Sequence, residues 1–155
     1  MKLKFEKMNE EEFDNYLEFF IPDYAQDLSV NFVLPLDKAM EESKDLMNDL
    51  LPNKQNSDGQ FLYNIHCTEQ KEKVGMIWYS IQPDIDRAYI YHIYINEEFR
   101  KMGYASSVLL ELEGMVKSSG ITSLGLSVFG QNQHAYSLYK KLGYKTAAIS
   151  MGKNI

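Results

Sequence analysis

The chain has 155 residues, of which 45% are hydrophobic and 25% are charged, and this composition suits one globular domain spanning residues 1–155. No run of about 18 apolar residues occurs, which excludes a membrane span, and the net charge of −6 argues against a nucleic-acid partner. The only cysteine, Cys67, excludes an intrachain disulfide and favours a reducing, cytoplasmic location.

The N-terminal third is expected to form one strand followed by helices. Residues 2–8 alternate apolar and polar side chains, as a half-buried strand does. Asn9 can cap a helix with acidic residues in its first turn, and Pro22 either ends this helix or starts a second short segment. A further helix is expected over about 35–51, and the polar stretch 52–60 is a loop.

The rest of the chain changes to strands and then to alternating strands and helices. The expected elements are strands at 61–67, 74–82 and 88–95, a helix at 104–117, a strand at 122–129, a helix at 134–143 and a strand at 145–151. Short polar connections between the first three strands suit antiparallel hairpins. The strand–helix–strand unit over 88–129 requires two parallel strands in one sheet. These patterns predict an α/β fold with a mixed sheet.

The turn between the strand at 88–95 and the next helix has the composition of an anion site. The first N–H groups of a helix lack intrahelical partners and lie at its positive end. Gly103 has no Cβ, so an anion can approach these groups, and Arg100 and Lys101 add positive charge. The stretch is neither a Walker loop nor a dinucleotide-binding fingerprint. A glycine that only relieves a tight helix entry is an equally good explanation of this stretch alone.

Two motifs together resemble the GNAT superfamily of N-acetyltransferases, in particular its bacterial stand-alone members. The first motif, Arg/Gln-x-x-Gly-x-Gly/Ala, is present here as Arg100, Gly103 and Ala105. The second, Asn-x-x-Ala-x-x-Leu-Tyr-x-x-x-Gly-Phe/Tyr, is present as Asn132, Ala135, Leu138, Tyr139, Gly143 and Tyr144. The resemblance covers 74–151, and 1–60 match only in the order of elements. It implies a mostly antiparallel sheet with a central parallel pair of strands that splay apart, and helices on both faces.

The resemblance implies acetyl-CoA as the cosubstrate, bound where the strands at 88–95 and 122–129 splay. Its pantetheine arm would pair with the strand backbone, and its pyrophosphate would lie on N–H groups from about Lys101 to Ser106. The expected cofactor-binding residues are Ile93, Tyr94, Ile95, Arg100, Lys101, Met102, Gly103, Tyr104, Ala105, Ser106, Asn132 and Tyr139. No metal site is expected, because His66 beside Cys67 supplies too few ligands.

The resemblance further implies direct transfer of an acetyl group to a primary amine in a ternary complex, without an acyl-enzyme. Tyr139 is expected to be the acid that meets the leaving thiolate, the alternative being a core tyrosine. His92 is the candidate base. Side chains alternate between the two faces of a strand, so His92 is expected to face away from Tyr91 and Ile93. A bulge in the strand would change the face on which His92 lies. A water relay held by Tyr89 and Tyr91 is the alternative base.

Two competing hypotheses stay open: a CoA-binding module or sensor without catalysis, and an acyltransferase that uses another acyl-CoA. The acceptor would be a small-molecule or peptide amine, selected by the N-terminal helices and the loop at about 23–36. The family resemblance leaves both a monomer and a homodimer open.

Overall fold

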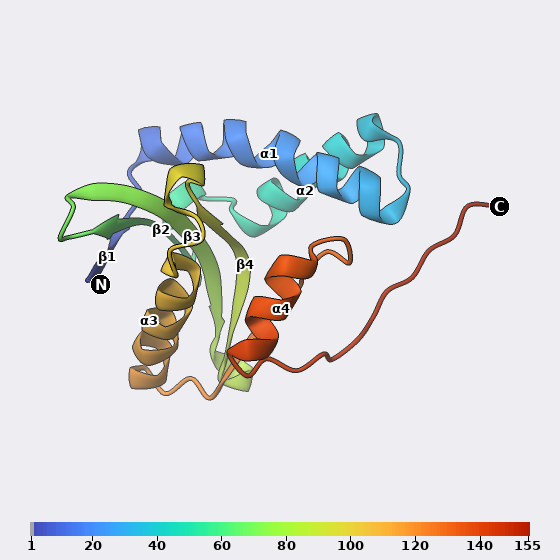
Figure 1. Ribbon diagram of the computed structural model, residues 1–155. Coiled ribbons are helices and arrows are strands. Elements are labelled where there is room, and N and C mark those ends of the chain that lie inside the picture. Colours follow the sequence, from blue (N-terminus) through green and yellow to red (C-terminus); the bar gives the residue numbers. More distant parts are fainter. Residues whose placement is uncertain (1) are drawn as a thin grey trace. The chain divides into compact units, whose positions relative to one another are not determined.

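The computed structural model describes residues 2–155 and divides into two compact units (Figure 1). The first, here called the sheet unit, contains residues 2–10 and Asn53–Ser127. The second, the helix unit, contains Glu11–Pro52 and Val128–Ile155. Each unit is assembled from two separate stretches of chain, and the single domain over 1–155 stays a prediction. Within residues 2–155, no helix is long and apolar enough to cross a membrane.

A five-stranded sheet in the order β1-β2-β3-β4-β5 forms the sheet unit. Its strands are β1 Leu3–Lys7, β2 Gln60–Cys67, β3 Glu72–Gln82, β4 Arg87–Ile95 and β5 Ser123–Leu126. Neighbours are antiparallel from β1 to β4, and β4 and β5 are parallel. The α/β class and the mixed, mostly antiparallel sheet are confirmed. The parallel pair lies at one end of this sheet and not at its centre.

Helix α3, Tyr104–Ser118, packs on the sheet and contacts β1 and β4 (Figure 1). Its apolar residues recur every three or four positions and are buried, as a helix that covers a sheet requires. The buried residues are Tyr104, Val108, Leu109, Leu112 and Val116. Three short 3-10 helices complete this unit, at Lys54–Asn56, Pro83–Ile85 and Glu97–Phe99. The prediction of a helix over 104–117 is therefore confirmed to within one residue.

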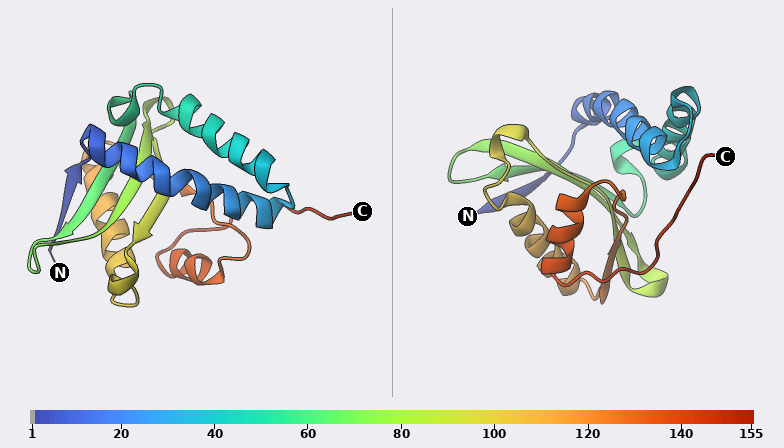
Figure 2. Two further views of the ribbon diagram at one scale, coloured as in Figure 1. Left: turned by 90° about the horizontal axis from the view of Figure 1, so that it is seen from above. Right: turned by 45° about the vertical axis from the view of Figure 1, so that its right-hand side comes forward.

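In the helix unit, α1 (Glu10–Phe32) and α2 (Leu36–Leu50) lie side by side in opposite directions (Figure 2). Ala25 and Leu28 of α1 pack with Ala39 of α2, and the small alanines allow the two helices a close approach. The buried Ser43 hydroxyl of α2 donates a hydrogen bond of 2.9 Å to the Ile21 carbonyl of α1. Helix α4, Gln133–Lys141, belongs to the same unit.

The prediction that α1 ends or restarts at Pro22 is wrong, because one helix runs through this residue. An interior proline removes one backbone donor and clashes with the preceding turn, at a cost of about 3 kcal/mol. Buried side chains on both sides of Pro22 offset this cost, Phe13 and Phe20 before it and Ala25 and Leu28 after it. Burial along the whole length of α1 outweighs the local preference at one position.

The predicted strand at 145–151 is also wrong. Residues after Tyr144 have no regular secondary structure and continue from α4 as an extended segment (Figures 1 and 2). Ile149 is 78% exposed and Met151 is 92% exposed. Alternating residues favour an extended backbone, but a strand also needs a neighbour to pair with. No strand of the described sheet pairs with this segment.

Candidate active site

The parallel strands β4 and β5 separate partway along β4. Their pairing begins at Arg87 and Ser123 and ends at Ile90 and Leu126. Beyond that point β4 continues over Tyr91–Ile95, still paired with β3 on its other side, while β5 has ended. The divergence lies beside the residues expected to meet the pantetheine arm, Ile93, Tyr94 and Ile95.

A β-bulge in β4 coincides with the separation. Trp78 of β3 is opposite His92, whereas the next residue, Tyr79, is opposite Ile90, so Tyr91 is the extra residue in β4. A bulge bends a strand and increases its local twist, which explains why β4 leaves β5 at this point. The bulge also shifts the alternation of β4 side chains between the two faces of the sheet. His92 therefore lies at the register position opposite Trp78.

His92 is partly buried, and its ring centre lies 6.2 Å from that of Tyr94. Burial disfavours the charged imidazolium and lowers the pKa of His92 to about 4. At neutral pH the imidazole is therefore uncharged and able to accept a proton. Its basicity is weak, because a low pKa means that the protonated form is poorly stabilised.

Tyr89 and Tyr91 have defined neighbours in the sheet unit. The Tyr91 ring stacks on Trp78 with ring centres 4.6 Å apart, and its distance from the Tyr89 ring is 4.9 Å. The Tyr89 hydroxyl lies 2.6 Å from Ser127 Oγ, just beyond β5. Ser127 is a residue of this region that the sequence did not single out, because a lone serine after a strand carries no motif.

The N-terminus of α3 follows directly from the end of β4 through Glu97–Phe99. Gly103 is its N-cap with φ 84°, and Lys101 also has a left-handed backbone, with φ 62°. No side chain caps the helix, and the first helical hydrogen bond is from Ser107 N–H to the Gly103 carbonyl. The N–H groups of residues 104–106 thus stand at the positive end of the helix.

This helix N-terminus fits a pyrophosphate. A Cβ built on Gly103 meets no atom within 4 Å, so the space in front of this glycine is open. Arg100 Nε donates a hydrogen bond of 2.8 Å to the Ile95 carbonyl, and its guanidinium lies 5.0 Å from the centre of the Tyr94 ring. Arg100 therefore anchors the loop to the end of β4 as well as adding charge.

Gly75 of β3 is a second residue of this region that the sequence motifs do not include. A Cβ at this position would lie 2.1 Å from the Tyr94 carbonyl oxygen. Only glycine lets β3 approach β4 so closely at the level of Ile95, its register partner. An isolated glycine within the strand-forming run VGMIW was the available signal.

Gly75→Ala is expected to destabilise the protein by about 1–3 kcal/mol, because backbone atoms of β4 must move to admit the methyl group. Chemical denaturation measures the change. Gly114→Ala is the matched control, since Gly114 lies inside α3 with no atom near a built Cβ. That substitution should stabilise the protein by about 0.5–1 kcal/mol. Equal effects of the two alanines would contradict the close approach at Gly75.

Asn132 and Tyr139 belong to the helix unit. Asn132 Oδ1 accepts a hydrogen bond of 3.2 Å from Ala135 N–H and caps α4. Burial raises the pKa of Tyr139 above its ordinary value, so its phenol is protonated at neutral pH. Its ring makes an edge contact with Tyr144 at 5.6 Å. The sheet unit brings together His92, the end of β4 and the α3 N-terminus.

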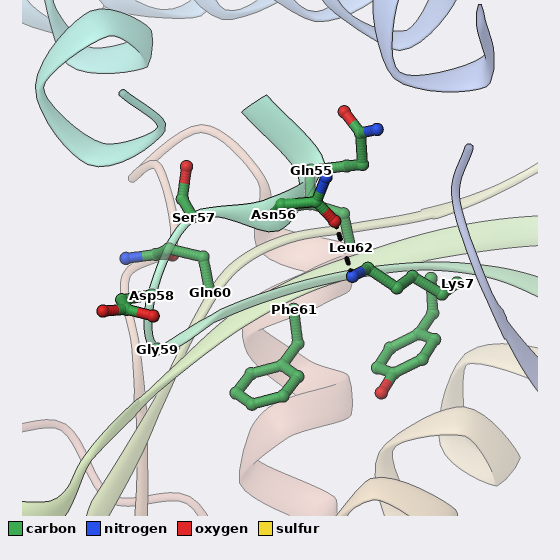
Figure 3. A pocket seen from close by; sticks show the side chains of 10 residues that line it. Lys7, Gln55, Asn56, Ser57, Asp58, Gly59, Gln60, Phe61 and Leu62 are labelled. Atoms are coloured by element: carbon green, nitrogen blue, oxygen red, sulfur yellow. Dashed lines mark hydrogen bonds between the residues drawn. The ribbon is translucent and has the colours of Figure 1, made fainter. Parts of the chain in front are cut away.

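Each unit has a cavity among its described residues. The one in the sheet unit has a volume of about 220 Å³ and is lined by Lys7 and by residues 55–63 (Figure 3). Lys7 Nζ donates a hydrogen bond of 2.8 Å to Asn56 Oδ1 at its wall. None of the candidate site residues lines it. The second cavity, in the helix unit, is lined in part by Asn132.

The fold and the diverging strands beside a glycine-capped helix place this chain in a class of α/β proteins that is acyltransferase-like. The profile of the acetyltransferase (GNAT) family matches residues 16–144, and the chain belongs to this family.

Relatives and solved structures agree with this assignment. YycN of Bacillus subtilis (strain 168), described as an uncharacterized N-acetyltransferase, is 32% identical over 100% of both chains. YdgE of the same strain, described in the same words, is 29% identical over 100% of this chain and 99% of its own. The crystal structure of YycN covers 99% of both chains with a TM-score of 0.92. A PaiA N-acetyltransferase from Thermoplasma acidophilum, solved with coenzyme A, has a TM-score of 0.67 at 20% identity, covering 97% of this chain and 94% of its own, and shares the fold.

Proposed function

We propose that the protein is an acetyl-CoA-dependent N-acetyltransferase that moves the acetyl group directly to a primary amine. The observation that carries this proposal is the end of β4–β5 pairing beside a helix N-terminus with open space at Gly103. An extended thiol arm can pair along a strand, and its phosphates suit the N–H groups of a helix N-terminus. The acceptor is a small-molecule or peptide amine, the protein works in the cytoplasm, and neither a nucleic acid nor a membrane is a partner.

Residues 101–106 hold the pyrophosphate in this proposal, and the backbone near Ile93 orients the arm. Bound acetyl-CoA supplies an acetyl thioester whose carbonyl carbon an amine can attack. His92, neutral at pH 7, accepts the proton that the ammonium must lose, directly or through a water beside Tyr89 and Tyr91. Tyr139 donates its phenolic proton to the leaving thiolate. A C–N bond forms as the C–S bond breaks, the second proton of the attacking nitrogen replaces the one that Tyr139 gave up, and no bond to the protein is needed.

Acetyl-CoA is expected to raise the melting temperature, because a ligand at 100 times its Kd adds about 2.7 kcal/mol to the stability of the folded state. Gly103→Val should abolish most of this response, since a branched side chain would stand where the phosphates bind. Differential scanning calorimetry with and without acetyl-CoA measures both effects.

Gly120→Val is the matched control for backbone strain. Gly120 has φ 86°, close to the 84° of Gly103, and also has open space around a built Cβ, but it lies at the other end of α3. Both valines should destabilise the free protein similarly, and only Gly103→Val should lose the response to acetyl-CoA. A normal response in Gly103→Val would contradict the phosphate site.

A further inference from the structure

The cavity of the sheet unit is a feature that the proposed acetyl transfer does not use. Its volume is about 220 Å³, and the residues that line it, Lys7 and 55–63, all belong to the sheet unit (Figure 3). They place the cavity where β1 ends, beside the first residues of β2. The volume is below the about 300–1,000 Å³ of sites for drug-sized molecules, which limits an occupant to about the size of one amino acid.

Lys7 gives this cavity a positively charged group in a defined position. It lies opposite Tyr63 on the neighbouring strand, so the two side chains share one face of the sheet. Its Nζ donates a hydrogen bond of 2.8 Å to Asn56 Oδ1, which holds the ammonium at the cavity wall (Figure 3). An ammonium has three N–H donors, so two remain for a ligand, and Nδ2 of Asn56 is a further donor. Donors of this kind bind a carboxylate.

Gln55 adds a hydrogen-bond acceptor to the same cavity. Its Oε1 is buried and has no hydrogen-bond partner among residues 2–155. Such an oxygen is rare in a folded protein, because burial removes its bonds to water without replacing them. A ligand that brings an N–H group into the cavity would satisfy it. Together with Lys7, this oxygen suits a small molecule that carries a carboxylate and an N–H group.

Two half-buried aromatic rings form the apolar part of the wall. The rings of Phe61 and Tyr63 stack with their centres 6.4 Å apart and their planes at 11°. Phe61 also stacks on the ring of Tyr79 at 5.1 Å, and Tyr79 is only 3% exposed. The buried ring fixes the other two in place. An apolar side chain of the ligand would lose contact with water by packing on these rings.

The charge around the cavity favours a ligand without net charge. Asp58 also lines the cavity, and Figure 3 shows its carboxylate away from the Lys7 ammonium. The whole chain has a net charge of −6, so it repels a simple anion. A zwitterion presents a carboxylate to Lys7 and has no net charge. An α-amino acid is the smallest common molecule that combines a carboxylate, an adjacent ammonium and an apolar side chain.

We propose that this cavity binds a small apolar α-amino acid, at a site separate from that of acetyl transfer. Lys7 and Asn56 bind its carboxylate, its amino group donates to Gln55 Oε1, and its side chain packs on Phe61. None of the residues proposed for acetyl transfer lines the cavity. The amino acid therefore binds here without reacting, and its binding does not depend on the proposed function.

Trp78 provides a spectroscopic signal for this binding. It is the only tryptophan of the chain, and its Nε1 donates a hydrogen bond of 2.8 Å to Oε1 of Gln60, a residue that lines the cavity. Indole emission depends on the hydrogen bond of the ring N–H and on the packing of the ring. An occupant that contacts Gln60 should therefore change the fluorescence of Trp78.

The test uses L-valine and two analogues that each lack one of its charged groups, 3-methylbutanoate and 2-methylpropan-1-amine. Calorimetry of the full chain without acetyl-CoA measures the three affinities. Valine should bind and change the emission of Trp78. Each analogue should bind at least about tenfold more weakly, because one charged hydrogen-bonding group is missing.

Variants of the cavity assign this binding to its wall. Lys7→Met keeps the length of the side chain, removes its charge and should raise the Kd for valine about tenfold. Lys4→Met is the matched control, because Lys4 is an exposed lysine of the same strand outside the cavity, and it should leave the Kd unchanged. Gln55→Met removes the buried oxygen, so it should weaken valine binding about threefold without lowering the melting temperature.

The outcomes separate this inference from the proposed function. Lys7→Met should keep the melting temperature and its response to acetyl-CoA, because Lys7 is exposed and outside the transfer site. No binding of valine, equal binding of valine and 3-methylbutanoate, or a Lys7→Met variant that behaves as Lys4→Met does overturns the amino-acid site and leaves acetyl transfer standing. Lys7-dependent binding of valine to a protein that does not respond to acetyl-CoA supports this site and overturns the proposed function.

Discussion

Tyr139→Phe is expected to lower kcat about 10²-fold, because it deletes the only proton that the proposed mechanism supplies to the leaving thiolate. General-acid contributions are typically about 10²–10⁴-fold, and a thiolate is a good enough leaving group to put this case at the lower end. The phenol is protonated at neutral pH, since burial raises its pKa. The ring and its edge contact with Tyr144 remain in the phenylalanine variant.

Affinity for acetyl-CoA should change by less than about threefold in Tyr139→Phe, because an interaction realised mainly in the transition state affects kcat and not binding. Steady-state turnover on the best amine, with cofactor affinity from calorimetry, separates the two quantities. Tyr136→Phe is the control on the same helix, where the exposed hydroxyl lies 3.0 Å from Thr146 Oγ1. Equal kcat in wild type and Tyr139→Phe would exclude the acid role, and weaker binding alone would leave Tyr139 a cofactor contact.

The elements that the sequence predicted well depend on local signals. Helix α3 has an apolar residue at every third or fourth position and a glycine directly before it, and its observed bounds match the expected ones. The parallel arrangement of β4 and β5 follows from the chirality of strand–helix–strand units. The cap that Asn132 forms on α4 is likewise local, because its side chain bonds to a neighbour three residues away.

The elements that the sequence predicted wrongly depend on contacts with residues that are distant in the sequence. Pro22 is tolerated inside α1 because side chains before and after it are buried, and no local pattern reports this. The segment at 145–151 has the composition of a strand, but pairing requires a neighbour that the pattern does not specify. The local propensity for secondary structure is thus overridden wherever tertiary contacts decide which structure forms.

For the candidate site, the sequence located the residue types but not their environments. The bulge at Tyr91 was recognised as a condition for the facing of His92, and only the register establishes it. The low pKa of His92 is a consequence of burial, which no spacing predicts. Lys7 and Asn56 are 49 residues apart in the sequence, and only the fold places them at one cavity.

The low pKa of His92 makes the free energy of unfolding depend on pH. This dependence must be measured before the role of His92 in catalysis is tested. A pKa of about 4 in the folded protein lies below the ordinary value of 6.5, so the unfolded chain binds the proton more tightly. The free energy of unfolding is therefore undiminished above pH 6.5 and falls as the pH decreases toward 4. The loss from this group at pH 5 is at most about 2 kcal/mol, given its partial exposure. His92→Ala should lack this loss.

His92→Ala is expected to lower kcat/KM at pH 7 about 10²-fold, the lower end of general-base effects, because a base with a pKa of about 4 drives proton transfer weakly. In the wild type, kcat/KM should rise with pH through a limb near pH 4, measured where denaturation shows the protein folded. His92→Ala should lose this limb and keep the rise at higher pH that reports deprotonation of the acceptor amine. His134→Ala, an exposed histidine of α4, is the matched control and should behave as wild type. An unchanged profile and rate in His92→Ala would exclude His92 as the base and assign the proton to the water relay beside Tyr89 and Tyr91.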